Sequence, residues 1–412
     1  MQNKSMGCTF NLLTSPCMAQ HNNIKSNYIT HYYKSTSDLP YDWNTLALKK
    51  DIFLSITYLH HIEENSQDDM EFRYVSIYNN KNEIAAVVYF QMYPFRADRS
   101  LNNTMKSKHG IATTCKQVIS KLIGFDTLLC GNIYLTGEHG FLYDLNKISL
   151  QEFMVELNKI IDNVQADFQA LHHKPLAVIV KDFYVDNNPY NDALVDAGFV
   201  RFQVQPNMVM NIRENWHTFD DYLADFHSKA RTRVNRALKK MSGVQVIPLT
   251  KALAASYSDK IEQLHRQVVD DSSFNTVKVT TDYKINLIEI LPDNYEMLGF
   301  FEGDNLISFC TYFIDDKKLI AHFLGFEKSL NHDKQLYLNM LLQMVKKAID
   351  KKCNRIIFAR TAMEIKSSIG AEAYQMDCYI RHSNYIMNKM AQPIFKFLSP
   401  KYEWTPRHPF KN

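Results

Sequence analysis

Apolar residues recur along this chain in two rhythms, every second position in some segments and every third or fourth in others. The first rhythm is typical of strands and the second of amphipathic helices. For the first half, they predict a helical region over 43–64, strands over 72–78, 83–90, 128–137 and 176–180, a long helix after Ser149, and a short helix ending near Gly198. Ser149 and Glu152 also form a capping-box signal for the long helix. Such alternation of helices and strands indicates an α/β fold.

The second half repeats this order of elements. We expect a helix over 251–269, a strand pair over 296–314 that turns at Gly303, a third strand over 317–326, a long helix over 334–350, a strand over 355–359 and a short helix ending at Gly370. The repetition indicates an internal duplication with its boundary near Asn211. We therefore divide the chain into a flexible tail (1–35), a first domain (36–211), a second domain (212–392) and a C-terminal extension (393–412).

Composition narrows the class of protein. A chain of 412 residues with 46% apolar and 22% charged residues is long enough for two globular domains. The formal charge of +3 is spread along the chain, so it favours no DNA partner. The seven cysteines are scattered without a CxxC pair, and no segment has the length and apolarity of a membrane span. We expect a cytoplasmic protein without a metal site, and contact with a membrane surface stays open.

A basic helix is expected between the two domains. Thr218 and Asp221 mark its beginning, and the helical pattern continues to Met241. Four cations follow at spacings of four, three and four residues, which places them along one edge: Lys229, Arg233, Arg236 and Lys240. Such an edge can hold phosphates of coenzyme A, of an acyl carrier protein's prosthetic group or of a tRNA acceptor stem. The alternative is a solvated helix face.

A second motif, from Glu364 to Ala371, follows the strand over 355–359. When Gly370 is aligned with Gly198, Lys366 lies opposite Leu194 in the first half. Because only the second copy keeps a lysine, we expect the chemistry in the second domain. The alternative is a surface Glu and Lys beside a packing helix.

Two turns complete the candidate positions. The junction from Gly325 to Asn339 lacks a glycine-rich phosphate turn, and Tyr337 and Asn339 lie at the beginning of the following helix. In the first half, 130–132 and 136–140 carry glycines that would let the backbone approach a ligand or simply bend sharply.

A helix between strands that diverge to admit a ligand is the plan of the Gcn5-related N-acetyltransferase (GNAT) superfamily. Over about residues 40–390, this element order and these motifs resemble the tandem-domain branch of that superfamily. The branch contains the Fem aminoacyltransferases of peptidoglycan cross-bridge synthesis and a large related family of peptidoglycan biosynthesis or recognition proteins. The resemblance implies two tandem GNAT-like domains with mixed sheets flanked by helices. It also implies transfer of an acyl or aminoacyl group to an amine.

The resemblance suggests roles for the candidate residues. Glu364 or Glu327 would accept the amine proton, and Lys366 would neutralise a donor phosphate or orient a substrate carboxylate. The donor-binding set would be Lys229, Arg233, Arg236, Lys240, Tyr337, Asn339 and Gly370. The acceptor would be a small-molecule or lipid-precursor amine.

The identity of the donor stays open between two classes. An acyl-CoA or acyl-carrier-protein thioester is one, and aminoacyl-tRNA is the other. The helix over 251–269 is too short for the coiled-coil arm of Fem proteins and has no heptads, which favours a thioester. A non-catalytic module that binds cell-envelope precursors is the alternative from another class. Signatures of nucleotide hydrolysis, dinucleotide binding, serine hydrolysis and zinc proteolysis are missing.

Overall fold

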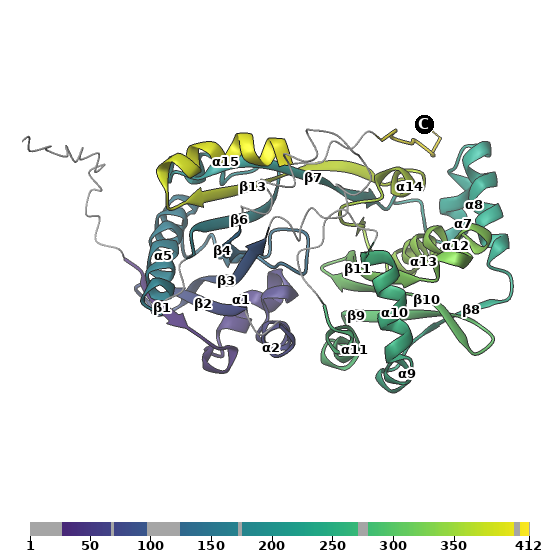
Figure 1. Ribbon diagram of the computed structural model, residues 1–412, viewed down its shortest axis with the longest axis horizontal. Helices are drawn as coiled ribbons and strands as arrows, with labels where there is room; N and C mark the ends of the chain where they lie inside the picture. Colours follow the sequence, from purple (N-terminus) through teal and green to yellow (C-terminus); the bar gives the residue numbers. More distant parts are fainter. Residues whose placement is uncertain are drawn as a thin grey trace, which may run out of the picture.

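One continuous sheet organises the molecule (Figure 1). The computed structural model describes residues 27–66, 70–96, 124–171, 175–270, 279–398 and 404–411. Within them the sheet has 13 strands in the order β1-β2-β3-β4-β6-β13-β7-β12-β11-β10-β9-β8, and β5 pairs with β3. Helices pack against this mixed sheet, so the predicted α/β class is confirmed.

The first half builds one side of the sheet. Its strands are β1 (Ile29–Tyr33), β2 (Glu71–Tyr78), β3 (Ile84–Arg96), β4 (Gly124–Cys130), β5 (Phe141–Tyr143), β6 (Ala177–Tyr184) and β7 (Val200–Asn211). Its helices are α1 (Trp43–Lys50), α2 (Ile56–Asn65), α5 (Leu150–Ala170) and α6 (Asn191–Asp196). The predicted capping box at Ser149 and Glu152 is present at the beginning of α5. Residues 29–33 fall within the predicted tail, yet they form β1 and pair with β2, while 1–26 lie outside the described residues.

The second half repeats the plan. Its strands are β8 (Val244–Pro248), β9 (Tyr295–Glu302), β10 (Asn305–Asp315), β11 (Lys318–Phe326), β12 (Arg355–Ile357) and β13 (Glu372–His382). Its helices are α7 (Phe219–Ala224), α8 (Ser228–Lys240), α9 (Lys251–Ser256), α10 (Ser258–Val269), α11 (Thr281–Ile290), α12 (Lys328–Lys334), α13 (Leu336–Asp350), α14 (Met363–Ser367) and α15 (Tyr385–Leu398).

The two halves exchange their last strands. β13, from the second half, pairs antiparallel with β6, and β7, from the first half, pairs antiparallel with β12. β7 and β13 also pair with each other at the centre of the sheet. In each half, one parallel pair precedes the exchanged strand, β4 with β6 and β11 with β12. The strand order is therefore nearly the same when read from either edge.

Apolar residues of both halves share one core. Phe53 and Tyr58 of the first half pack edge-on against Phe313 of the second, with ring centroids 4.9 and 5.9 Å apart. Tyr58 also hydrogen-bonds Tyr283 through their hydroxyl groups, which lie 3.0 Å apart. Burial of large aromatic side chains across the seam stabilises the two halves as one body.

Several predicted helices are interrupted. The segment from Thr218 to Met241 forms α7 and α8, separated where Phe226 bridges to Phe410 near the C-terminus. The segment 334–350 begins within α12 and continues as α13 after Gln335, which has a left-handed φ of 51°. Helical periodicity survives these breaks, which is why the pattern alone did not reveal them. Among the described residues, no helix has the length and apolarity to cross a bilayer.

Candidate functional site

Lys366 lies inside the protein on α14. Its side chain is 4% exposed. Nζ donates hydrogen bonds to the backbone carbonyls of Phe358 (2.7 Å), Ala359 (3.2 Å) and Arg360 (2.6 Å). Burial lowers the pKa of Lys366 to about 7. The three N–H donors of its ammonium group therefore hold the loop that follows β12.

That loop has an unusual backbone. Ala359, Thr361 and Ala362 all have left-handed φ values, 58°, 67° and 46°. Non-glycine residues adopt this conformation at a cost, and a run of them persists only where surrounding contacts hold it. The bonds from Lys366 supply such contacts, and they position Arg360 between the strained residues.

The other residues of the α14 motif face the C-terminal segment. Glu364 is exposed and forms an ion pair with Arg407. Gly370 has a φ of 107°, and a Cβ atom there would come within 2.2 Å of the Phe410 ring. Glycine at 370 thus allows both the turn and the close packing of Phe410.

The basic helix α8 is attached to α12 and α13. Asn339, which is 2% exposed, donates from Nδ2 to the Ala237 carbonyl (2.9 Å), and Lys240 donates to the His332 carbonyl (3.0 Å). Tyr337 packs near Phe326, with ring centroids 6.0 Å apart, and burial raises its pKa. Asn339 and Tyr337 therefore serve the packing of this corner of the molecule.

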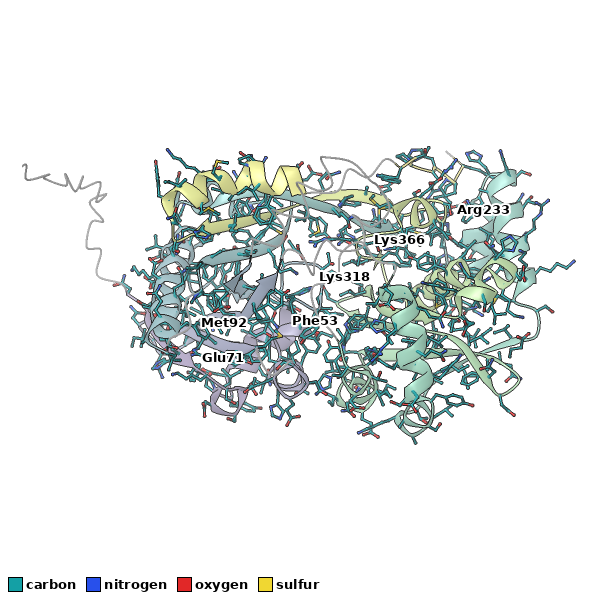
Figure 2. The ribbon with its side chains drawn as sticks, in the orientation of Figure 1. Phe53, Glu71, Met92, Arg233, Lys318 and Lys366 are labelled. Carbon is teal, nitrogen blue, oxygen red and sulfur yellow. The ribbon has the colours of Figure 1, made fainter. Side chains whose placement is uncertain are left out.

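The four predicted cations on α8 remain exposed. In the described part of the chain, Lys229, Arg233, Arg236 and Lys240 have no carboxylate within 4.0 Å. Figure 2 shows Arg233 on the outer edge of the molecule and Lys366 nearer its middle. Glu327 lies elsewhere, before α12, where it forms an ion pair of 3.2 Å with Lys260. The predicted site residues thus lie around α14, along α8, and at α12 and α13, to which α8 is attached.

A buried charge cluster lies where the halves meet. Asp182 on β6 is fully buried, has a left-handed φ of 70°, and forms an ion pair with Arg360. Lys181 contributes a second ion pair, with Nζ 2.5 Å from the carboxylate. Burial alone would raise the pKa of Asp182, but the charges of Arg360 and Lys181 outweigh it and lower the pKa below its ordinary value. The cluster carries one more positive than negative charge.

The turn between β4 and β5 lies beside this cluster. Gly131 and Gly137 adopt φ values of 140° and 132°, which lets the chain leave β4 sharply. Lys181 Nζ donates to the carbonyls of Asn132 (2.9 Å) and Leu135 (2.6 Å), and the amide of Gly137 donates to Asp182 (3.3 Å). The charge cluster therefore also holds the turn.

A cavity of about 240 Å³ opens where β4 and β6 separate. Their parallel pairing ends at Cys130 and Val180. The charged residues Glu138, Lys181 and Lys50 contribute to its lining, and four rings supply aromatic surface: Phe141, Tyr143, Phe183 and Tyr190. Tyr190 lies at the centre of these rings, 5.3 Å from Phe141 and 5.2 Å from Phe183.

Glu138 is the carboxylate of this cavity. One oxygen accepts a hydrogen bond from the Tyr184 amide (3.4 Å), and among the described residues the other has no partner. Glu138 is exposed to solvent, yet the protein atoms near its carboxylate desolvate that group and raise its pKa. Desolvation makes the carboxylate a stronger proton acceptor than an ordinary glutamate.

The next residue, His139, packs against the segment between α1 and α2 of the first half. Its Nδ1 lies 2.7 Å from Asp51, whose side chain is 8% exposed. The His139 ring also packs edge-on against Phe53, with centroids 4.8 Å apart. These contacts fix the turn, and with it the direction of Glu138.

Comparison with solved structures identifies the architecture. The chain superposes on the crystal structure of FemX with a TM-score of 0.51 and 12% sequence identity, covering 89% of this chain and 99% of that one. The chain has a FemX-like tandem GNAT fold. A tandem GNAT protein from the clavulanic acid biosynthesis pathway gives a TM-score of 0.48 at 7% identity, covering 86% of this chain and 99% of that one. L-PGS from Bacillus licheniformis gives 0.43 at 9% identity, with coverage of 83% and 96%.

Sequence comparison adds no family beyond this fold. No known family profile and no curated protein sequence matches the chain. Within this fold, the cavity lies where the two parallel strands of the first half diverge. We expected diverging strands to admit a ligand, but the sequence placed the chemistry in the second domain, and a site in this first-half cavity would depart from that prediction.

Our sequence reasoning missed Lys181, Asp182 and Arg360. Lys181 and Asp182 interrupt an otherwise apolar strand, and two adjacent charges in a buried strand require partners. The sequence alone therefore indicated that Lys181 and Asp182 have charged or polar partners. Arg360 gave none, because its pairing with Asp182 depends on the strand exchange. In the described segments, no three His, Cys, Asp or Glu side chains are grouped as metal ligands would be.

Proposed function

We propose that the protein transfers an acyl or aminoacyl group from an activated donor to a primary amine that binds in the first-half cavity. The observation that carries this proposal is Glu138, a carboxylate with a raised pKa in a cavity lined by four aromatic rings, where the described residues provide a partner for one of its oxygens and none for the other. A carboxylate with aromatic walls suits an ammonium ion, which gains both an ion pair and cation–π contacts.

The chemistry follows from this arrangement. The amine binds as an ammonium ion and gives one proton to Glu138. The neutral nitrogen then attacks the donor's carbonyl carbon, and the new C–N bond forms as the bond to the thiol or ribose oxygen breaks. The proton held by Glu138 passes to the leaving thiolate or ribose alkoxide, and the second proton that the nitrogen loses as the amide forms is released to solvent. General acid–base catalysis of this kind contributes about 10²–10⁴-fold to a rate.

The donor would approach from the charge cluster. Lys181 and Arg360 together outweigh Asp182, so this side of the cavity favours a donor phosphate or the developing oxyanion. In this proposal, Lys366 acts through the loop that carries Arg360 and is a positioning residue. The exposed cations of α8 remain candidates for a more distant part of the donor.

We place a thioester of coenzyme A or of an acyl carrier protein first among donors, and aminoacyl-tRNA second. The cavity volume of about 240 Å³ limits the buried part of the acceptor to a small amine or to the amine end of a larger precursor. A lipid precursor would have to keep the rest of its structure outside.

The test is an amide-formation assay on the full chain. Donors from acetyl-CoA to palmitoyl-CoA, acyl carrier protein thioesters and aminoacyl-tRNA are each incubated with a panel of primary amines, and products are detected by mass spectrometry. With an active pair, Glu138→Gln should lower kcat/KM by about 10²–10⁴-fold, because an amide cannot take the proton. Glu214→Gln, at an exposed residue of the second half, is the matched control and should leave kcat/KM unchanged.

The dependence of kcat/KM on pH tests the role of Glu138 independently. Because the pKa of Glu138 is raised, kcat/KM should fall on acidification at a higher pH than an ordinary glutamate would cause. Full activity in Glu138→Gln would refute the assignment of the base. Saturable binding of amines without turnover by any donor class would favour the alternative, a non-catalytic binding module.

A further inference from the structure

Helix α15 carries an apolar surface that no described part of the chain covers. Tyr385, Ile386, Met387 and Met390 are 69%, 70%, 39% and 47% exposed, although they lie within six consecutive positions. The opposite face of the helix is anchored, because Phe395 stacks on Phe202 of β7 with ring centroids 4.2 Å apart. Figure 1 shows α15 along the outer rim of the molecule, over β13 and β7.

Two further exposed apolar residues lie on elements that contact α15 or the turn before it. Leu176, at the beginning of β6, is 40% exposed, and its carbonyl accepts a hydrogen bond from the Ser383 amide just before α15. Val195 on α6 is 47% exposed, and Asn388 of α15 donates to the nearby Gly198 carbonyl. A surface of clustered large apolar side chains usually meets a partner.

The charges of α15 itself have one sign. Its sequence contains the cations Lys389 and Lys396 but no Asp or Glu. Lys389 lies over the Tyr385 ring, with Nζ 4.5 Å from the centroid. Apolar residues on one helix face, accompanied by lysines and an aromatic ring, suit the boundary between lipid headgroups and acyl chains.

We propose that α15 docks the protein onto an anionic lipid surface. Ile386 and Met390 would enter the acyl boundary, while Lys389 and Tyr385 remain at headgroup level. A second copy of the chain is a poorer partner. In a two-fold dimer about α15, the lysines of one copy would face those of the other, and α15 has no Asp or Glu to pair with them.

The experiment is co-sedimentation of the full-length protein with vesicles. One set contains phosphatidylglycerol and phosphatidylcholine, and the other contains phosphatidylcholine alone. We expect binding to the anionic vesicles that weakens as salt is added, and at least about tenfold weaker binding to the neutral ones. Neither donor nor acceptor is needed, so the result does not depend on the proposed transferase activity.

Two double variants make the test specific. Ile386→Glu with Met390→Glu should reduce binding to anionic vesicles by at least about tenfold while leaving thermal unfolding nearly unchanged, because both side chains are exposed. Leu48→Glu with Val155→Glu adds the same charge at two other exposed apolar sites, 59% and 53% exposed, and should bind like the parent.

Three outcomes would overturn the proposal. The parent protein fails to bind anionic vesicles, or the α15 variant binds as well as the parent, or the control variant loses binding equally. Light scattering tests whether a second copy of the chain covers α15 instead of a lipid surface. A parent dimer that the α15 substitutions convert to a monomer, with no vesicle binding by either, would assign this face to self-association.

Discussion

At the residue scale, the ammonium group of Lys366 has three N–H donors, and three backbone carbonyls surround it. Removing the donors would leave the carbonyls of Phe358, Ala359 and Arg360 without these partners in a partly buried loop. A buried polar group without a hydrogen-bond partner lowers the free energy of unfolding by about 1–3 kcal/mol, which is the cost of removing it from water. The loop also holds left-handed residues that depend on these contacts.

We therefore predict that Lys366→Met lowers the free energy of unfolding by about 2–4 kcal/mol, as measured by urea denaturation. Its neighbour provides the control. Glu364→Gln removes only an exposed ion pair with Arg407 and should change the free energy by less than about 1 kcal/mol. If Lys366→Met keeps full stability and loses turnover, Lys366 acts in the chemistry itself and not through the loop.

Asp315, at the end of β10, offers a prediction about pH. Burial, together with the nearby charge of Asp51, raises the pKa of Asp315 to about 6. An unfolded aspartate titrates near about 3.9. Between these two values the folded state binds more protons than the unfolded state, so this group makes stability fall as pH rises through that window.

Replacing Asp315 with Asn should remove this effect. Below about pH 4, the variant and the parent should have the same free energy of unfolding. Above about pH 6, the value for the variant should be higher by about 1 kcal/mol, a figure that allows for solvent screening because Asp315 is partly exposed. Thermal denaturation across this range measures the difference. Asp316→Asn, at the 74% exposed neighbouring side chain, is the control, and an equal gain there would assign the effect to net charge.

At the element scale, periodicity and capping signals predicted most of the fold. The capping boxes at Ser149 and Thr218 lie where expected, and the hairpin turns at Gly303 as predicted. Local patterns succeed here because a capping serine and an apolar stripe need only neighbours within a few residues. The repeated element order also led to the FemX-like fold, which the comparison supports.

The candidate site was harder to predict from the sequence than the fold, because it depends on contacts between distant segments. The exposed cations of α8 lie on one edge as the spacing predicted, but their role remains untested. The buried position of Lys366 depends on carbonyls of a strained loop, and left-handed residues such as Thr361 leave no local pattern. Glu138 was part of a predicted turn, but its cavity depends on where β4 and β6 separate.

At the scale of the whole molecule, the strand exchange makes each half incomplete alone. Among the described strands, β7 pairs only with β12 and β13, both from the second half, and β6 loses one neighbour without β13. Asp182 would likewise lose Arg360, and the seam aromatic residues, such as Phe53, would lose Phe313. The boundary near Asn211 therefore divides the sequence, although the described sheet and core extend across it.

We predict that a chain ended after Asn211 does not form a stable domain. β7 would expose its backbone hydrogen-bonding groups along both edges, and such open strands aggregate. When residues 212–412 are produced as a separate chain in the same cells, the two pieces should co-purify as a soluble 1:1 complex, because each supplies the other's missing strand.

The full chain should unfold in one cooperative transition, with the same midpoint by far-ultraviolet circular dichroism and by tryptophan fluorescence. A soluble monomer of the first piece with its own sharp thermal transition would show that the exchanged strand is dispensable, and two separated transitions in the full chain would show that the halves fold independently.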